Sequence, residues 1–489
     1  MKLKIWHFFT IILFAVMVVV ISSPLSMSAT NSQFLTDPFL QLPTPSSVRV
    51  VWFTSQAGTH HTVTYGHNLD RTVEADTKAL SRTREDTTSH LEGNSLSAPT
   101  PRPIWRHEAL VRDLIPGKRI PYYVTSIFSD GETVNSRVFS LSATPLPESP
   151  LKILLTSDHQ LKPLTSANIQ KVTETVGQVD AVFFAGDLVN TPDRASEWFD
   201  DSRGNAFFAS LQGKANYELT KNGVTTTYQG GEIIQHAPLF LTIGNHEVMG
   251  RYSDTLPLDD QFSDAIPRAV AQKFLPENAN ETEIKNHSFN IDTVQEIFNF
   301  PNDNSYYAVT FGDIRLVVLY ATNVWRYPST DNDKKGKYSE PKQNLDNPQN
   351  WGYGQHIFEP IYKGSEQYSW LEKELNYPEF QNAKYKVVML HHPPHSLGEN
   401  IVPAYTNPVQ IIERDTQGNI TEIRYESPQD ENYLIRDIIP LLESKKVQLV
   451  FYGHSHLWNH FLSPAGTHFL ENSNVGNSYG AYKIGRAHV

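Results

Sequence analysis

Five short apolar segments after residue 150 each end in a cluster of polar residues, and this pattern limits the possible folds more than any other feature. Each segment has the length and apolar character of a buried β-strand. The clusters are Asp158, Asp187, Asn245 to Glu247, His391 with His392, and His454 with His456. Because open α/β sheets bind ligands at the carboxyl ends of their strands, we expect the five clusters to meet at one site.

Residues 151–483 alternate strand patterns with helical patterns. Predicted strands cover residues 153–156, 181–185, 239–243, 314–320, 386–390 and 448–452, and predicted helices cover 166–176, 366–375 and 433–443. This alternation predicts an α/β domain in which β-sheets are flanked by helices. The long polar segments 200–235, 249–304 and 325–364 are expected to be loops, a class of segment that often carries function.

Residues 34–146 have a different texture, with short alternating runs separated by turn residues. Residues 47–54 place Val48, Val50 and Trp52 on one face of a strand. The turn sequence 129–131 joins the runs 122–127 and 133–141 as a hairpin. About a hundred residues of this kind predict an all-β sandwich. Prolines at 145, 147 and 150 mark the boundary to the α/β domain.

The first residues have the order of a signal peptide. Lys2 and Lys4 precede an apolar run, residues 5–21, and small residues follow up to Ala29. We expect cleavage after residue 29, a secreted or periplasmic protein and no stable membrane insertion; a retained anchor is the alternative. At the other end, residues 484–489 read as a non-native tail.

The net charge and the absence of cysteine limit the substrates and the metal ligands that this chain can have. The formal net charge of −12 disfavours nucleic-acid polymers, which reward basic surfaces. A small anionic substrate would need local positive charge, and bound metal ions would supply it. The chain has no cysteine, so metal ligands must come from His, Asp, Asn and water. Each polar cluster alone is weak evidence, but their combination predicts a dinuclear metal site.

The order of these motifs resembles the calcineurin-like metallophosphoesterase superfamily over residues 152–482. The N-terminal region is similar to the fibronectin type III-like domain of purple acid phosphatases, on the residues 50–52, 65–66 and 114–117 before Tyr122. The resemblance implies two divalent or trivalent metal ions bridged by Asp187. It implies one site completed by Asp158 and His456, and another completed by Asn245, His391 and His454.

Two positions depart from the family pattern. Gln160 stands where many members have a histidine ligand, and Asn190 stands where purple acid phosphatases have a tyrosinate. We therefore expect no purple chromophore. Gln160 could ligate through its amide oxygen or orient a metal-bound water, and His159 is a further possible ligand. The donor set suits Zn, Mn, Fe or Mg without choosing among them.

The remaining histidines have less specific expectations. The resemblance implies that His246 protonates the leaving group or holds a phosphoryl oxygen, with Glu247 or another carboxylate fixing its tautomer. The alternative for His246 is that it lies outside the metal ligands and only orients them. The same role is expected for Gln160, Asn190 and Glu247. His392 is expected to pack or orient, and His395 to line a pocket.

These features favour an exported phosphoesterase that hydrolyses phosphate mono- or diesters by attack of a metal-bridging hydroxide, with His246 assisting the leaving group. The alternative is a surface binding or adhesion protein whose metal centre is inert. A third possibility is another two-metal hydrolase, acting on phosphonates, pyrophosphates or nucleotides. Its substrate wall would come from aromatic residues in the long loops: Trp198, Phe199, Tyr252, Trp325, Tyr327, Trp351 and Tyr353. Oligomeric state is left open.

Overall fold

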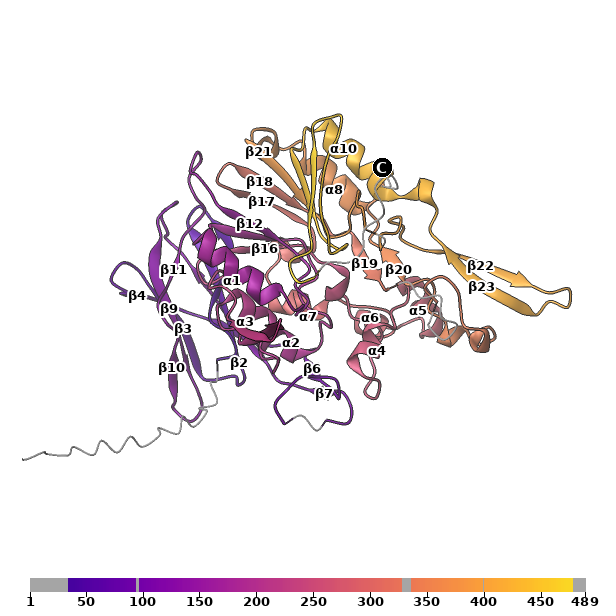
Figure 1. Cartoon of the computed structure of the whole chain (residues 1–489), viewed down its shortest axis with the longest axis horizontal. Helices are drawn as coiled ribbons and strands as arrows, with labels where there is room; N and C mark the ends of the chain where they lie inside the picture. Colours follow the sequence, from indigo (N-terminus) through magenta and orange to yellow (C-terminus); the bar gives the residue numbers. More distant parts are fainter. Residues whose placement is uncertain (1–33, 94–95, 328–335, 399, 478–489) are drawn as a thin grey trace, which may run out of the picture. The chain divides into compact units, whose positions relative to one another are not determined.

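The computed structural model describes residues 34–93, 96–327, 336–398 and 400–477 (Figure 1). The predicted signal peptide and the predicted tail lie outside these ranges. Among the residues that are described, none of the helices combines the length and apolar character that crossing a membrane requires.

The N-terminal region is a β-sandwich. One sheet has the order β1 (Phe39–Thr44), β2 (Ser47–Thr54), β8 (Trp105–Val111) and β5 (Asp76–Ala79). The other has the order β10 (Thr133–Asn135), β9 (Ile120–Ile127), β3 (His60–Tyr65) and β4 (Arg71–Glu74), with β11 (Phe139–Leu141) also on β9. Val48, Val50 and Trp52 lie in the core between the sheets, as their alternation predicts.

The second face of β2 is buried as well. Val51 and Phe53 belong to the core of the α/β domain, where the Phe53 ring lies 5.0 Å from Phe199 and 5.6 Å from Phe208 between ring centres. The first sheet therefore separates two hydrophobic cores, which explains why residues 50–53 are apolar without alternation.

The predicted strand 133–141 is in fact two strands, β10 and β11. The Ser136 hydroxyl accepts a hydrogen bond from the backbone N–H of Val124 (3.0 Å), which takes a ladder position on β9. This side-chain bond ends the pairing of β10, and the chain rejoins β9 further along at Phe139.

The α/β domain contains two main sheets. The first is parallel and has the order β12 (Ile153–Thr156), β13 (Ala181–Phe184) and β16 (Leu239–Leu241). The second is mixed and has the order β17 (Tyr307–Phe311), β18 (Ile314–Val318), β21 (Tyr385–Met389), β24 (Leu449–Tyr452), β26 (His468–Asn472) and β25 (Trp458–Leu462). Side chains from both sheets share one core.

Helices cover the outer face of the second sheet. Alternate residues of β18, β21 and β24 pack against α8, α9 and α10 in a separate core. The helices are α1 (Thr165–Thr175), α2 (Ala195–Phe199), α3 (Phe207–Leu211), α4 (Leu258–Phe262), α5 (Arg268–Phe274), α6 (Glu281–Asn286), α7 (Asp292–Ile297), α8 (Glu366–Glu374), α9 (Pro378–Gln381) and α10 (Ile439–Ser444). Two-stranded hairpins lie in the long connections: β14 (Tyr217–Lys221) with β15 (Val224–Tyr228), β19 (Thr322–Trp325) with β20 (His356–Phe358), and β22 (Val409–Arg414) with β23 (Ile420–Glu426).

A short segment of the N-terminal region, residues 82–86, inserts buried charges into the α/β domain. We call it the strap; it contains β6 (Arg84–Glu85), which pairs with β7 (Thr100–Pro101). Arg84 donates to Asp193 (2.8 Å), and Glu85 accepts from the backbone N–H of Ser196 (2.7 Å). Asp86 accepts from the backbone N–H of Leu258 (2.6 Å). The strap thus fixes the segments that follow β13 and precede α4.

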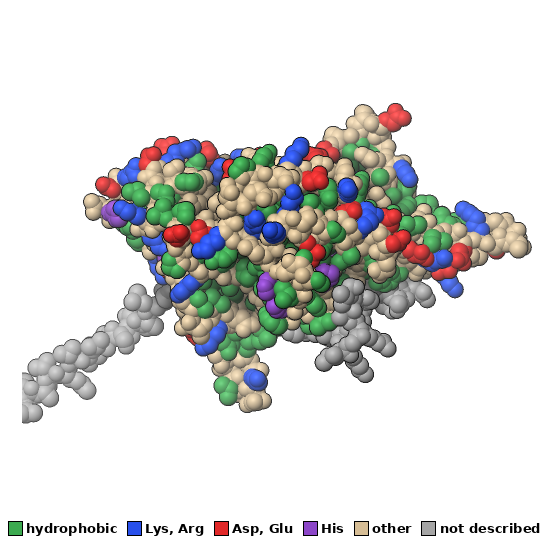
Figure 2. All heavy atoms as spheres, turned by 90° about the horizontal axis from the view of Figure 1, so that it is seen from above, with side chains coloured by type: hydrophobic (Ala, Val, Ile, Leu, Met, Phe, Trp, Pro, Cys, Tyr) green, Lys and Arg blue, Asp and Glu red, His purple; other side chains and the backbone are tan. Residues whose placement is uncertain are grey.

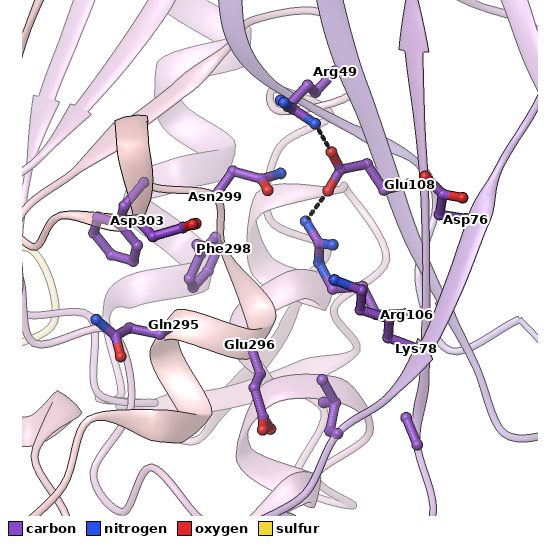
Figure 3. A pocket seen from close by; sticks show the side chains of 13 residues that line it. Arg49, Asp76, Lys78, Arg106, Glu108, Gln295, Glu296, Phe298, Asn299 and Asp303 are labelled. Carbon is purple, nitrogen blue, oxygen red and sulfur yellow. Dashed lines mark hydrogen bonds and ion pairs between the residues drawn. The ribbon is translucent and has the colours of Figure 1, made fainter.

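A cavity of about 510 Å³ lies between the sandwich and α7 (Figure 3). Its two buried or half-buried arginines, Arg49 and Arg106, bind the two carboxylate oxygens of Glu108. Acidic side chains of Asp76, Glu296 and Asp303 complete a lining of mixed charge. The positive charge in this cavity is therefore already matched by the protein.

Candidate metal centre

All six predicted ligands come together where the carboxyl ends of the two sheets meet. Asp158 follows β12, Asp187 follows β13, and Asn245 lies in a 3₁₀ turn (Asn245–Glu247) after β16. His391 follows β21, and both His454 and His456 follow β24. Each of the six side chains is buried. The predicted convergence at the strand ends is thus observed, with three strands from one sheet and two from the other.

One half of the centre is formed by Asn245, His391 and His454. The Asn245 amide oxygen lies 3.0 Å from His391 Nε2 and 3.1 Å from His454 Nδ1. Asp187 Oδ1 lies 3.3 Å from the same His391 nitrogen. Ligand atoms of Asp187, His391 and His454 all lie within 4.8 Å of one another, which is close enough for a common metal ion.

The other half contains Asp158 and His456. His456 Nε2 lies 3.5 Å from Asp158 Oδ1, and the backbone N–H of His454 donates to Asp158 Oδ2 (3.0 Å). The Ser157 hydroxyl also contacts this carboxylate. Asp187 lies between the two halves, since it contacts His391 on one side and Gln160 on the other.

Hydrogen bonds fix the imidazole rings of His391, His454 and His456. His391 Nδ1 donates to the Ala185 carbonyl (2.7 Å), and His454 Nε2 donates to the Asn400 carbonyl (3.1 Å). His456 Nδ1 contacts the Asn477 amide oxygen. Each ring therefore turns its other nitrogen toward the carboxylates, with the outer nitrogen fixed by an oxygen, an arrangement typical of metal-binding histidines. The donor set and its outer contacts fit two metal ions.

Backbone conformation and glycines bring these loops together. Asp158, Asp187, His454 and His456 have positive φ values of 54°, 59°, 87° and 55°. Non-glycine residues in this region cost about 1–3 kcal/mol each and cluster at functional sites. A Cβ at Gly186 would lie 2.8 Å from the Gly244 nitrogen, and one at Gly453 would lie 2.5 Å from Asp158 Oδ2. Glycine is therefore required before these ligands.

Charge in the metal-free centre is unevenly distributed. Burial raises the pKa of Asp158 well above its usual range, and the nearby Asp187 charge adds to this. For Asp187, burial is outweighed by His391 and His246, which hold its pKa below the usual value. Burial would lower the pKa of His391, but Asp187 raises it to about 10. Asp158 and Asp187 thus share one strong cationic partner, His391. Additional positive charge in the centre would stabilise these two buried carboxylates.

His246 lies at the cavity wall beside Asn245. Its Nδ1 donates to the Asn190 carbonyl (2.7 Å), and its ring stacks on Phe262 with 5.0 Å between ring centres. Burial lowers the pKa of His246 to about 4, although the Asp187 charge opposes this. The expectation that Glu247 or another carboxylate fixes the His246 tautomer is wrong, because a backbone carbonyl does so.

Glu247 instead supports the loop that carries Asp187. Its carboxylate accepts from the backbone N–H groups of Asp187 (2.8 Å), Leu188 (2.7 Å) and Gly244 (2.8 Å). Burial raises the pKa of Glu247 to about 7, with a further contribution from Asp187. Glu247 therefore orients the backbone around Asp187, and it forms no hydrogen bond with an imidazole of the described residues.

The two departures from the family pattern are linked. Gln160 donates its amide N–H to Asp187 Oδ2 (2.9 Å), and Asn190 donates to the Gln160 carbonyl (2.7 Å). With its amide nitrogen toward the carboxylate, Gln160 orients Asp187. Asn190 connects this loop to His246. The role of Gln160 toward a metal ion or a metal-bound water stays a prediction.

Three other histidines stay out of the centre. His159 Nε2 bonds the Thr156 hydroxyl (2.8 Å) and its ring packs on Phe184. His392 Nε2 donates to the Val402 carbonyl (2.8 Å), and His395 packs on Phe469. His392 also packs against the ring of His454, with 4.8 Å between ring centres, so it supports a predicted ligand from outside the centre.

The family model for calcineurin-like phosphoesterases matches residues 151–457, well over half of the chain. The chain belongs to the calcineurin-like phosphoesterase family. The matched residues include all six predicted ligands.

A solved purple acid phosphatase from yellow lupin (Lupinus luteus) seeds is similar in fold, with a TM-score of 0.55 and 16% identity over 92% of this chain. This calcineurin-like phosphoesterase spans 66% of the lupin chain. A dimetal phosphatase from Danio rerio matches 67% of this chain and 88% of its own at 12% identity, with a TM-score of 0.34. No curated protein sequence matches the chain. The lupin likeness supports the fold and not a substrate.

A cavity of about 260 Å³ opens onto the centre of this calcineurin-like phosphoesterase. Of the seven aromatic residues predicted as a substrate wall, Trp325 and Tyr327 line it. Trp198 and Phe199 lie in the core, while Trp351 packs with Tyr353 in a separate cluster. The aromatic residues of the long loops therefore mostly pack those loops.

Sequence reasoning missed six cavity residues. These are Lys162, Phe262, Ser263, Arg326, Lys337 and Asn400. Arg326 is fully buried, donates to the carbonyls of Asn245 (3.1 Å) and Val248 (2.9 Å), and lies 3.6 Å from the Phe262 ring centre. It holds the turn that carries Asn245 and His246. Nothing in the loop pattern around Arg326 indicated this contact.

Proposed function

We propose that the protein is an exported two-metal phosphoesterase that hydrolyses small phosphate mono- or diesters, with His246 assisting the leaving group. The observation that carries the proposal is the convergence of the six buried ligands at the strand ends, where Asp187, Asn245, His454 and His456 line one cavity together with His246. Export rests on the signal-peptide pattern of the sequence. Acidic and basic side chains are interspersed on the face in Figure 2, which favours a small substrate over a polyanion.

Asp158, Asp187 and His456 would hold one metal ion, and Asp187, Asn245, His391 and His454 the other. Bound metal ions supply Lewis acidity toward phosphoryl oxygens and lower the pKa of a bound water to about 7. The side chains around them set the geometry: the carbonyls of Ala185 and Asn400 fix the rings of His391 and His454.

His246 is placed to exchange a proton with the substrate. Its Nδ1–H is committed to the Asn190 carbonyl, so Nε2 is the nitrogen left for the substrate. In the imidazolium form, Nε2–H would donate its proton to the leaving oxygen as the phosphorus–oxygen bond breaks. Burial lowers the pKa of His246 and so disfavours the imidazolium. An anionic phosphoryl group beside the ring would raise this pKa and favour the protonated form.

The test combines metal analysis with turnover. We would measure metal content and hydrolysis of p-nitrophenyl phosphate and bis(p-nitrophenyl) phosphate, before and after chelation. His246→Ala should lower kcat by about 10²- to 10⁴-fold, the usual contribution of general acid catalysis, with metal content unchanged. His460→Ala, at an exposed histidine of β25, is the control and should match the wild type.

Metal-loaded wild-type protein without turnover on either ester would refute the enzyme and favour the binding protein. Loss of metal together with activity in His246→Ala would refute the role given to this side chain.

A further inference from the structure

Lys162 carries a positive charge into the cavity beside the metal centre. It lines the cavity with Gln160, Asp187, His246 and His456. Its ammonium lies 3.4 Å from the Asn190 amide oxygen, which is a weak hydrogen bond. Within the described part of the chain, no carboxylate forms an ion pair with Lys162. Its charge is therefore directed at the cavity without a protein counterion in contact.

The larger cavity beside α7 shows the opposite arrangement. There, Arg49 and Arg106 are both bound by Glu108 (Figure 3), and Asp76, Glu296 and Asp303 also line the cavity, so its cations have counterions within the protein. In the cavity at the metal centre, Asp187, Asp158 and Glu197 attract the charge of Lys162 from beyond contact distance. An anion that enters this cavity would meet an available ammonium group.

Lys162 also lies on the half of the centre that departs from the family pattern. Gln160 and Asn190 are neutral where the resemblance implies an imidazole or a tyrosinate. The ammonium of Lys162 contacts Asn190 itself. In place of an anionic phenolate, this half thus presents two amides and a cation, a combination suited to a ligand with more negative charge.

We propose that Lys162 binds a phosphoryl oxygen of the substrate and makes the enzyme prefer phosphomonoesters over phosphodiesters. The proposal rests on the proposed function and names its substrate class. A monoester carries up to two negative charges on the phosphoryl group, whereas a diester carries one. An ammonium is a compact point charge and a common phosphate ligand, so it rewards the extra charge.

The experiment compares Lys162→Met and Lys162→Arg with wild type, all metal-loaded and with metal content measured. Lys171→Met is the matched control, since Lys171 is an exposed residue of α1. For Lys162→Met we expect kcat/KM on p-nitrophenyl phosphate to fall about 10- to 100-fold, the range for a hydrogen bond to a charged group. Hydrolysis of the bis-ester should change far less, and Lys162→Arg should retain most of the monoester preference.

Binding of inorganic phosphate, followed by calorimetry, is a second readout. Lys162→Met should weaken it about tenfold or more, within the same range. Equal losses on both esters, or unchanged phosphate binding, would overturn the role of Lys162. If wild type hydrolyses neither ester but binds phosphate through Lys162, the proposed function fails while the phosphate site stands.

Discussion

The two halves of the metal centre are built differently. Around Asn245, His391 and His454, backbone carbonyls fix the rings, and each ligand contacts another within about the length of a hydrogen bond. Around Asp158 and His456, the side chains of Ser157 and Asn477 add to one backbone contact, from the N–H of His454 to Asp158. Backbone contacts survive substitution of neighbouring side chains. The half with the larger share of side-chain support is the one in which this chain departs from its family pattern.

The largest effect should come from removing a histidine from each half. His391→Ala should lower activity by more than about 100-fold, the upper end for losing an outer partner of a metal ligand, and release the metal ion of its half. His456→Ala should leave that metal ion bound. Elemental analysis and p-nitrophenyl phosphate turnover would check this, with His460→Ala as control. Equal metal loss from both variants would show that the halves do not act separately.

The two halves should also differ in whether their histidines release a proton when a metal ion binds. In the metal-free protein, Asp187 raises the pKa of His391 to about 10, whereas burial lowers the pKa of His456 to about 4. His391 is therefore protonated at neutral pH and must lose its proton to bind metal, while His456 is already neutral. Between about pH 6 and 8, metal affinity should rise about tenfold per pH unit for this proton.

Calorimetry in buffers of different ionisation enthalpy would count the protons. Wild type should release one proton from His391 when the half of Asn245 binds metal, and His456→Ala, which keeps that metal ion, should release it as well. No proton release in either protein would contradict the protonated state assigned to His391.

The smallest effect should come from restoring the family residue at position 160. Gln160→His would place an imidazole beside Asp187 and should tighten metal binding about tenfold, the lower end for changes around a metal site. A competition assay with a chelating dye would measure it. Gln178→His, an exposed change just after α1, is the control. Weaker binding in Gln160→His would indicate that the amide contact to Asp187 matters more than an added ligand.

The sequence predicted the strand ends well because the information there is local. A short apolar run followed by a polar residue defines both the strand and the place where its ligand emerges, as at β12 and Asp158. The sequence also identified Gln160 and Asn190 as departures from the family pattern, because both stand at a fixed spacing in the sequence from the ligand motifs.

Contacts between distant segments could not be read in this way. Alternation assigned one face of β2 to a core, yet on the other face Phe53 is buried by rings from α2 and α3, and Val51 belongs to the same core. The partner of His246 is a backbone carbonyl, a group that every residue carries and that no pattern distinguishes. The division of the strands between two sheets likewise depends on long-range pairing.

The strap has a consequence for the order of events during synthesis. Arg84 leaves the ribosome 109 residues before its partner Asp193, and Asp86 leaves 172 residues before Leu258. Contacts so far apart in the chain form late, after the entropy of closing the intervening loop is lost. Asp193 without Arg84 would be a buried charge lacking its ion-pair partner. The sandwich is thus synthesised before the α/β loops that it supports. An α/β domain expressed without the sandwich would contain Asp193 without Arg84 as its ion-pair partner.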